Sequence, residues 1–301
     1  MLEFKPVTLE DKPWIDEIVA EENSRSADFN FGNIYIWDRH FKQLVARSGK
    51  RIVTKLRYGG RPAFAFPIGS GSLEQTVLAV KEFADYKKYP LRFYGVEKHN
   101  AELLEQLFPG KFSFALQEGQ GDYIYSIDKL STYAGKALHG KKNHCNRFEK
   151  EHPGWSFKPI TRELVPACLD FLSVWQETNA GRLEESITNE HDAIVRAFAA
   201  YEKLGLEGGA LFADGRIIGF SLGERCSSDC FDVHFEKAEI DINGAYTMVC
   251  RELAKMVKAN HPEIEYINRE EDMQIEGMRK SKESYKPEYI LEKYLAEWNY
   301  D

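Results

Sequence analysis

Apolar and polar residues alternate over short stretches of the first half of the chain, and other stretches repeat apolar residues at helical spacing. Turn-forming pairs such as Ser48-Gly49 and Gly59-Gly60 separate these stretches. An antiparallel meander followed by alternating helix and strand is typical of a mixed sheet with helices on both faces. Helices are predicted over residues 31–41, 73–86 and 101–107, and strands over residues 43–47, 50–56, 62–68, 91–96, 112–116 and 123–127.

The second half of the chain repeats this order of elements. The fold class predicted from the whole pattern is α/β, in the form of α+β mixed sheets. Strands are predicted over residues 155–160, 207–213, 216–224, 231–237, 264–268 and 289–295. Helices are predicted over residues 163–177, 190–204, 244–258 and 276–282.

Two short sequence repeats suggest that the halves are homologous. The segment FKPVTLE at residues 4–10 returns as FKPITRE at residues 157–163, an offset of 157 − 4 = 153. Gly60-Arg61 followed by AFAFPIG returns as Gly215-Arg216 followed by IIGFSLG, an offset of 215 − 60 = 155. We therefore expect an N-terminal domain at 1–130, a basic helical linker at 131–154 and a C-terminal domain at 155–301.

The linker is the densest basic stretch in an acidic chain, whose net charge is −8. That charge repels polyanions, so a nucleic acid such as tRNA would bind only at a local basic patch. Helical spacing makes Lys142, Asn143 and Arg147 a candidate anion-binding face, although a solvated helix face explains the same residues. The basic residues are Lys136, Lys141, Lys142, Arg147 and Lys150.

Composition excludes several classes of protein. With 43% hydrophobic residues the chain has ample material for a core, and no apolar run approaches the ~20 residues of a membrane span. The charged start MLEFKPVTLEDKPW is unlike a signal peptide, so a cytoplasmic location is expected. The 5 cysteines contain no CxxC pair, and no metal site is expected from them.

The strand at residues 231–237 carries the densest group of titratable residues. Strict alternation would place Asp232, His234 and Glu236 on one face and Lys237 on the other. A functional interpretation makes Glu236 a general base, assisted by His234, which titrates near neutrality. Lys237 would then hold a substrate carboxylate or phosphate. The competing interpretation is a plain solvent-exposed face.

Further polar candidates follow this strand along the chain. Asn268 ends the next strand and could bind a substrate carbonyl, or simply form a turn. Asp272 precedes a short helix, where it could bind a substrate amine or cap the helix. Arg279 and Lys280 lie toward the end of that helix, which favours cations in any case. Tyr285 is a candidate proton donor, or a core residue.

These motifs resemble known proteins. The order of elements in each half looks like the GNAT acyltransferase fold. KKN, HFEKAEIDINGAY and NREEDMQIEGMRKSKESYKP resemble a bacterial family similar to the C-terminal domain of phosphatidylglycerol lysyltransferase and, more distantly, to Fem-type peptidyltransferases. The residues that fall in the family's order are Asn268, Asp272, Gly277, Arg279, Lys280, Tyr285 and Pro287.

The resemblance implies two tandem GNAT-like domains and transfer of an acyl or aminoacyl group. Relatives of this kind use an aminoacyl-tRNA as donor, whereas ordinary GNAT enzymes use a coenzyme A thioester. In the latter, the loop before the central helix binds pyrophosphate, and Gly244 and Ala245 occupy this position here. Asp241 in the same loop repels phosphate, which weakens the coenzyme A interpretation.

Three hypotheses follow. The first is an acyl or aminoacyl transferase that acts on an amine or hydroxyl of a small-molecule, lipid or peptide acceptor, with the C-terminal domain active. The second is a degenerate GNAT pair that binds a ligand or partner without catalysis. The third is a coenzyme A acetyltransferase for a small amine. In each case AFAFPIG has no counterpart to His234 or Glu236, so the first half is expected to be structural or to shape the acceptor site.

Overall fold

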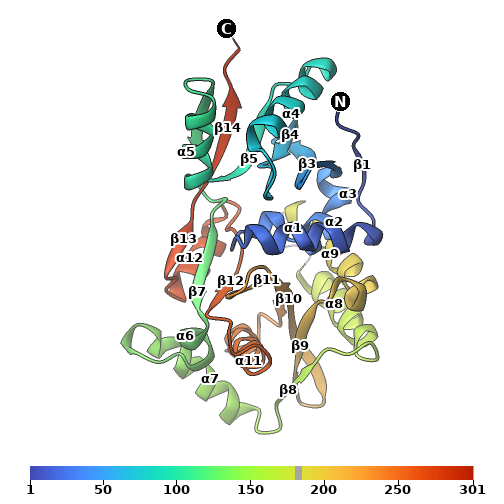
Figure 1. Cartoon of the computed structure of the whole chain (residues 1–301). Helices are drawn as coiled ribbons and strands as arrows, with labels where there is room; N and C mark the ends of the chain where they lie inside the picture. Colours follow the sequence, from blue (N-terminus) through green and yellow to red (C-terminus); the bar gives the residue numbers. More distant parts are fainter. Residues whose placement is uncertain (180–184, 301) are drawn as a thin grey trace. The chain divides into compact units, whose positions relative to one another are not determined.

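The computed structural model describes residues 1–179 and 185–300, which divide into two compact units (Figure 1). The first unit contains Met1–Asp122, Glu271–Ile275 and the C-terminal segment from Ile290. The second unit contains the described residues of Tyr123–Glu270 and Glu276–Tyr289. Among the described residues, no helix combines the length and the apolar character that crossing a bilayer requires.

The first unit is built on a mixed sheet whose strand order is β1-β2-β3-β4-β5-β14-β6. All pairs in the meander β1 to β4 are antiparallel, and β4 then pairs with β5 in parallel. Strand β14, from the far C-terminus, lies between β5 and β6. The strands are β1 (Lys5–Pro6), β2 (Leu44–Ser48), β3 (Arg51–Tyr58), β4 (Arg61–Ala65), β5 (Arg92–Glu97), β6 (Phe112–Leu116) and β14 (Lys293–Trp298).

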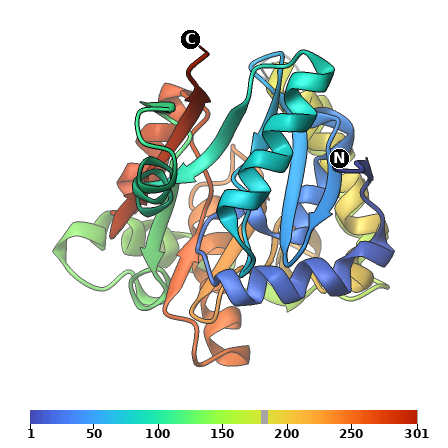
Figure 2. The same ribbon diagram turned by 45° about the horizontal axis from the view of Figure 1, so that its top comes forward.

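Helices pack on this sheet through aromatic side chains. Figure 2 shows α4 crossing the strands, and its Phe83 ring lies 6.2 Å from that of Phe64 on β4. Ser72 fixes the start of α4, because its hydroxyl accepts a hydrogen bond from the Gln75 amide. The helices are α1 (Lys12–Glu22), α2 (Phe31–Ile36), α3 (Asp38–Phe41), α4 (Leu73–Lys87) and α5 (Lys98–Leu107), with 3-10 turns at Leu9–Asp11 and Ala27–Phe29.

The second unit repeats this plan. Its sheet has the order β8-β9-β10-β11-β12-β7-β13, and β11 and β12 form the parallel pair. Strand β7, which precedes the predicted linker, lies between β12 and β13. The strands are β7 (Asp122–Ser126), β8 (Ser156–Pro159), β9 (Glu207–Ala213), β10 (Arg216–Arg225), β11 (Cys230–Ala238), β12 (Tyr266–Asn268) and β13 (Tyr289–Leu291).

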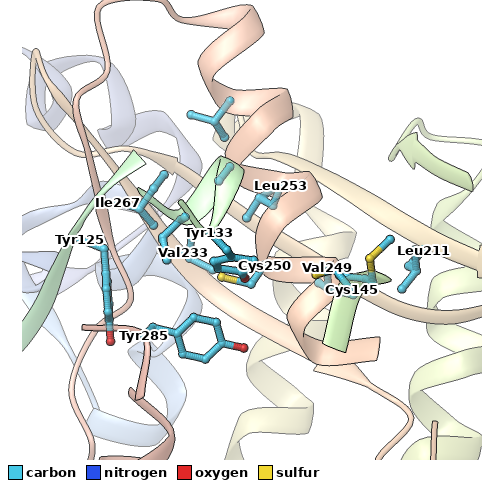
Figure 3. Packing of buried hydrophobic residues seen from close by; sticks show 14 of the residues in the cluster. Tyr125, Tyr133, Cys145, Leu211, Val233, Val249, Cys250, Leu253, Ile267 and Tyr285 are labelled. Atoms are coloured by element: carbon cyan, nitrogen blue, oxygen red, sulfur yellow. The ribbon is translucent and has the colours of Figure 1, made fainter. Parts of the chain in front are cut away.

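Helix α11 (Ala245–Asn260) covers one face of this sheet. Apolar residues recur along it at helical spacing and are buried, as Met248, Leu253 and Val257 are. Figure 3 shows Val249, Cys250 and Leu253 of α11 in the same core as residues of β7, β11 and β12. The other helices are α6 (Ile127–Thr132), α7 (His139–Glu151), α8 (Val165–Asn179), α9 (Glu185–Ala199), α10 (Tyr201–Leu204) and α12 (Glu276–Ser284), with a 3-10 turn at Lys136–Leu138.

The two sheets confirm the first sequence repeat and correct the second. Residues 4–10 contain β1, and residues 157–163 begin within β8; each of these is an edge strand of its sheet. By contrast, AFAFPIG begins in β4, the fourth strand of its sheet, whereas IIGFSLG lies in β10, the third strand of its own. A glycine turn followed by an apolar strand occurs at both the β2–β3 and the β3–β4 hairpin of the first sheet, so this repeat matched non-equivalent hairpins.

The predicted domain boundaries also need correction. The chain enters the second unit at Tyr123, and the predicted linker 131–154 is part of that unit rather than a connector. The C-terminal strand β14, predicted to belong to the second domain, lies in the first sheet. Each sheet thus takes one strand from the opposite half of the chain. A boundary drawn at one point in the sequence cannot describe this exchange.

Candidate active site

A β-bulge on β11 organises the polar residues of the second unit. Leu222 on β10 lies opposite Phe235, and the next residue, Gly223, lies opposite Val233. His234 is therefore an extra residue with no opposite number on β10. Such a bulge interrupts the strict alternation of faces along the bulged strand.

The bulge overturns the prediction that Asp232, His234 and Glu236 share one face. Val233 and Ala238 both belong to the core that packs against α11, although an odd spacing would separate them in a regular strand. Beyond the bulge, Glu236 turns to the α11 side, where its carboxylate binds Arg269 and influences Cys250. Asp232 and His234 thus belong to one polar group, and Glu236 belongs to another.

The first group surrounds His234, whose side chain is fully buried. Its Nδ1 lies 3.1 Å from Glu270 Oε1 and 3.5 Å from Asp232 Oδ2, and its Nε2 lies 3.1 Å from Glu224 Oε1. Burial lowers the pKa of His234, but the carboxylates of Asp232, Glu224 and Glu270 raise it well above its usual value. Without a further ligand this imidazole stays protonated, so it is a poor general base, contrary to the prediction.

The second group is built on an ion pair between Glu236 and Arg269, with Nη2 2.8 Å from Oε1. Both side chains are nearly buried, at 11% exposure each. Burial raises the pKa of the Glu236 carboxyl, and the adjacent guanidinium opposes that shift. A carboxylate held this way is a positioning group rather than the general base that the sequence predicted.

Aromatic rings line the other side of Arg269. Its guanidinium lies 4.5 Å from the ring centre of Tyr285 and 5.7 Å from that of Tyr125. The Tyr285 hydroxyl forms a hydrogen bond with the Thr247 side chain, and burial raises the pKa of Tyr285 far above its usual value. Tyr285 therefore lies beside Arg269, and its phenol is a weak proton donor.

Lys141 of α7 completes this group. Its Nζ lies 3.6 Å from the ring centre of Tyr285. Burial, reinforced by the positive charge of Arg269, lowers the pKa of Lys141 to about 8. Near neutral pH a sizeable fraction of this amine is therefore uncharged and able to accept a proton.

Lys141 also lines a pocket at the N-terminus of α11, with a volume of about 410 Å³. The loop before the helix is held against α7, because His144 Nδ1 lies 2.8 Å from Asn243 Oδ1. The lining residues are Lys141, His144, Ile240, Asp241, Ile242, Asn243, Gly244, Tyr246 and Thr247. The predicted Gly244 therefore lines this pocket, and buried Ala245 begins the helix beside it.

Gly244 permits this close approach, and its replacement is expected to destabilise the second unit. Its φ is +86°, and an added Cβ would lie 2.7 Å from the His144 carbonyl oxygen. Gly244→Ala should lower the free energy of unfolding by about 1–3 kcal/mol in a urea titration. The control is Gly277→Ala in α12, where a Cβ meets open space. Equal stability of the two variants would contradict this explanation.

Three other predicted residues lie outside the pocket. The Lys237 ammonium binds Glu190 at 2.6 Å and covers the Trp175 ring, and its role in substrate binding stays a prediction. Asn268 and Asp272 are buried turn residues that accept backbone hydrogen bonds from Glu270 and Gln274 respectively. Asp272 belongs to the first unit.

The remaining predicted residues lie on helix surfaces. Lys142, Asn143 and Arg147 are exposed on α7, where Arg147 pairs with Glu151 four residues on. Lys280 is exposed on α12 and pairs with Glu276, and Arg279 beside it is half-buried. These surface ion pairs leave the charged residues of α7 accessible to a polyanion.

The chain is similar in sequence to known proteins. Residues 20–297 match the model of a family described as phosphatidylglycerol lysyltransferase, C-terminal. The chain belongs to this family. An uncharacterised protein of Mycoplasmoides gallisepticum is 26% identical over 185 residues, which cover 60% of this chain and 57% of that protein. The chain thus matches little more than half the length of that curated relative.

Solved structures extend the family assignment to the fold. A conserved protein of unknown function from Bacteroides thetaiotaomicron VPI-5482 is 35% identical, with a TM-score of 0.95 over 99% of this chain and 100% of that one. The L-PGS structure from Bacillus licheniformis is 18% identical, with a TM-score of 0.69 over 99% and 94%. A tandem GNAT protein from the clavulanic acid biosynthesis pathway is 13% identical, with a TM-score of 0.50 over 100% of both chains. The family fold here is two tandem GNAT-like domains, as predicted.

Sequence reasoning about this family member missed Glu224, Glu270 and the central role of Arg269. Glu224 and Glu270 come from β10 and from the turn after β12, so only the strand order brings them to His234. Arg269 directly follows Asn268, so strand alternation would turn its side chain to the opposite face, and this is the signal that could have placed it near Glu236. Lys141 was seen only as one charge of a basic run.

Proposed function

We propose that this chain is an acyltransferase that moves an aminoacyl or acyl group from an activated donor to an amine or hydroxyl acceptor. The observation that carries the proposal is Lys141, an amine with a lowered pKa that lines the pocket at the N-terminus of α11. It lies against the ring of Tyr285, which the Arg269 guanidinium also contacts. Membership of a lysyltransferase family supports the same reaction class.

Lys141 supplies the proton chemistry in this mechanism. Its neutral amine takes the proton from the acceptor as the acceptor nitrogen or oxygen attacks the donor carbonyl. A new bond to the acyl carbon forms, and the bond to the leaving oxygen or sulfur breaks. The Lys141 ammonium then returns the proton to that leaving atom. The group begins and ends as a neutral amine, so the reaction balances.

Arg269 supplies the charge that stabilises the transition state. Its Nη2 is held by Glu236, while Nη1 is buried and makes no hydrogen bond to any residue in the described part of the chain. A substrate carbonyl oxygen that becomes negative would satisfy this donor. Glu236 holds the guanidinium in place and keeps it charged, which is the role we assign to it instead of general base.

The pocket fits an aminoacyl-tRNA donor better than coenzyme A. A pyrophosphate needs free amide groups at the start of α11, but the Ala245 amide already donates to the Ile242 carbonyl. Asp241 also lines the pocket and repels phosphate. The exposed residues Lys142 and Arg147 on α7 offer the cationic surface that a tRNA backbone requires.

The acceptor is proposed from the family description alone. A phosphatidylglycerol lysyltransferase attaches an amino acid to a hydroxyl of a lipid headgroup, and a related lipid hydroxyl is the first acceptor to test here. A peptide or small-molecule amine would use the same proton transfer to Lys141. The first unit lacks these polar groups in β4 and is given no part in the proton transfer.

The test presents purified protein with each donor in turn. Lysyl-tRNA and alanyl-tRNA are offered with phosphatidylglycerol vesicles, and acetyl-CoA is offered with simple amines. When the aminoacyl group of the tRNA is labelled, we expect the label to appear in a lipid or amine product. When the acetyl group of acetyl-CoA is labelled, we expect no labelled product. Transfer from acetyl-CoA alone would overturn the donor assignment. Failure with every donor would favour the non-catalytic GNAT pair.

Charge reversal on α7 tests the tRNA-binding surface separately. Lys142→Glu combined with Arg147→Glu should weaken tRNA binding at least tenfold and reduce its salt dependence, because fewer counterions are released. The matched control reverses Lys203 and Lys255, two exposed lysines elsewhere in the second unit. Filter binding at several salt concentrations measures both. Equal loss in the two double variants would indicate a general field effect and remove this surface.

A further inference from the structure

Three possible metal ligands lie together at the bulge of β11. They are Asp232, His234 and Glu270, and one ligand atom from each lies within 4.8 Å of the other two. The His234 Nδ1 atom is 3.1 Å from Glu270 Oε1 and 3.5 Å from Asp232 Oδ2. Ligand atoms around a metal at ~2.1 Å are separated by ~3.0 Å in octahedral and ~3.4 Å in tetrahedral geometry. The observed separations are therefore those of a coordination shell.

The opposite side of the imidazole provides an independent observation. His234 Nε2 lies 3.1 Å from Glu224 Oε1, on the neighbouring strand β10. Histidines that bind metals typically donate their second ring N–H to a carboxylate, which fixes the tautomer and the ring orientation. Glu224 would hold Nε2–H in this way and leave the Nδ1 lone pair directed at Asp232 and Glu270.

Charge balance within the cluster points in the same direction. Three carboxylates, from Asp232, Glu224 and Glu270, surround one imidazole, and Asp232 and His234 are buried. Among these four side chains, an imidazolium supplies one positive charge. A divalent cation with a neutral imidazole supplies two, and buried like charges are costly when they are left uncompensated.

We propose that Asp232, His234 and Glu270 bind a divalent transition-metal ion of the Mn²⁺ to Zn²⁺ series, with Glu224 orienting the imidazole. Nitrogen and carboxylate oxygen donors together suit these ions better than Mg²⁺ or Ca²⁺. The ion joins β11 to the turn that follows β12. The cysteine spacing that gave no metal site in the sequence does not bear on this cluster, because it contains no cysteine.

The test uses the full chain, first treated with a chelator and then dialysed. Zn²⁺ and Mn²⁺ are titrated by calorimetry, and the thermal unfolding midpoint is recorded with and without each ion. We expect one ion per chain and a rise of several degrees in the midpoint, since a ligand that binds only the folded state stabilises it. Mg²⁺ at the same concentration should have little effect.

Two variants locate the site. Glu270→Gln removes a direct ligand from a part-exposed position and should weaken binding at least tenfold, while Glu224→Gln removes only the orienting group and should weaken it by ~10-fold. The control is Glu207→Gln, which disrupts the separate contact of Glu207 with His261 in the same unit. Circular dichroism of the metal-free variants checks that each is folded.

The possible outcomes separate clearly. Saturable binding that Glu270→Gln weakens and Glu207→Gln leaves unchanged supports the site. No uptake of either ion by the wild-type chain overturns it and leaves a protonated His234 as the explanation of the cluster. Binding that survives Glu270→Gln and Glu224→Gln unchanged also overturns it. Because every readout is binding or stability, the result does not depend on the transferase proposal.

Discussion

Replacing Lys141 with methionine is expected to reduce the turnover number for acyl transfer by ~10²–10³-fold, the usual contribution of a positioned general base. Methionine retains much of the apolar contact with Tyr285 while removing the only proton-accepting atom of the side chain. The Michaelis constant for the donor should change little, because Lys141 acts on the transferred proton. Steady-state kinetics with the donor that gives product in the transfer test measures both the turnover number and the Michaelis constant.

The pH profile gives this variant a signature that a structural defect would not produce. Burial lowers the pKa of Lys141 to about 8, and the amine must be neutral to accept a proton. Wild-type turnover should therefore rise as the pH passes through about 8 and then level off. The methionine variant should lose that rise. Its control is Lys150→Met, an exposed lysine on the same helix α7.

Two results would contradict the role of Lys141. One is a Lys141→Met variant whose turnover matches that of Lys150→Met. The other is a variant that is slow but retains the wild-type pH profile, since the titrating group would then lie elsewhere. Substitution of Arg269 gives a further contrast, because its loss should lower turnover and also move the rise in activity to higher pH, since its positive charge helps to lower the pKa of Lys141.

Periodicity predicted most elements of this fold, because each helix and strand buries a regular apolar pattern. Helix α4 and strands β5 and β6 begin and end within a few residues of their predicted limits. The same reasoning failed at His234, because one extra residue in β11 reverses the faces of everything after it. A bulge depends on how neighbouring strands pair, and no residue pattern within β11 marks it.

The exchange of one strand between the two sheets also could not be predicted from the sequence. Strands β7 and β14 are short strands that mix apolar and polar residues, and nothing local says which sheet each one joins. For the same reason, the sequence did not predict which candidate-site residues lie together. Glu236 was singled out from the sequence, but its partner Arg269 and its neighbour Lys141 come from distant elements. Only the assembled second unit shows that Glu236 is bound to a guanidinium and that a lysine has the lowered pKa.

Lys293 explains how the exchanged strand β14 is retained in the first unit. Its ammonium lies 2.8 Å from Asp122 Oδ1 and 2.9 Å from Asp28 Oδ2, and the Lys293 and Asp122 side chains are almost completely buried. Asp122 in turn accepts a hydrogen bond from the Ala27 amide through Oδ2. One buried network thus joins three segments: β14 through Lys293, the start of β7 through Asp122, and the 3-10 turn before α2 through Asp28.

Lys293→Met is therefore expected to lower the free energy of unfolding by about 3–5 kcal/mol, because it leaves two carboxylates without their shared cation. Asp122→Asn alone should also destabilise, since the ammonium keeps only one carboxylate. In the double variant the cost should be smaller than the sum of the two single losses by more than 1 kcal/mol. Urea titrations of the four proteins measure this coupling, and strictly additive losses would contradict the network.

The pH dependence of this network has a definite sign. Burial lowers the pKa of Lys293, but Asp122 and Asp28 raise it well above its usual value. A lysine whose pKa is raised on folding stabilises the protein fully below its unfolded pKa of ~10.4, and this stability is lost as pH rises toward the folded pKa. From neutral pH to about 10, Lys293 should therefore keep the free energy of unfolding of the wild-type protein above that of Lys293→Met by a constant amount. The difference should narrow only in more alkaline solution, because that is where the Lys293 ammonium finally loses its proton.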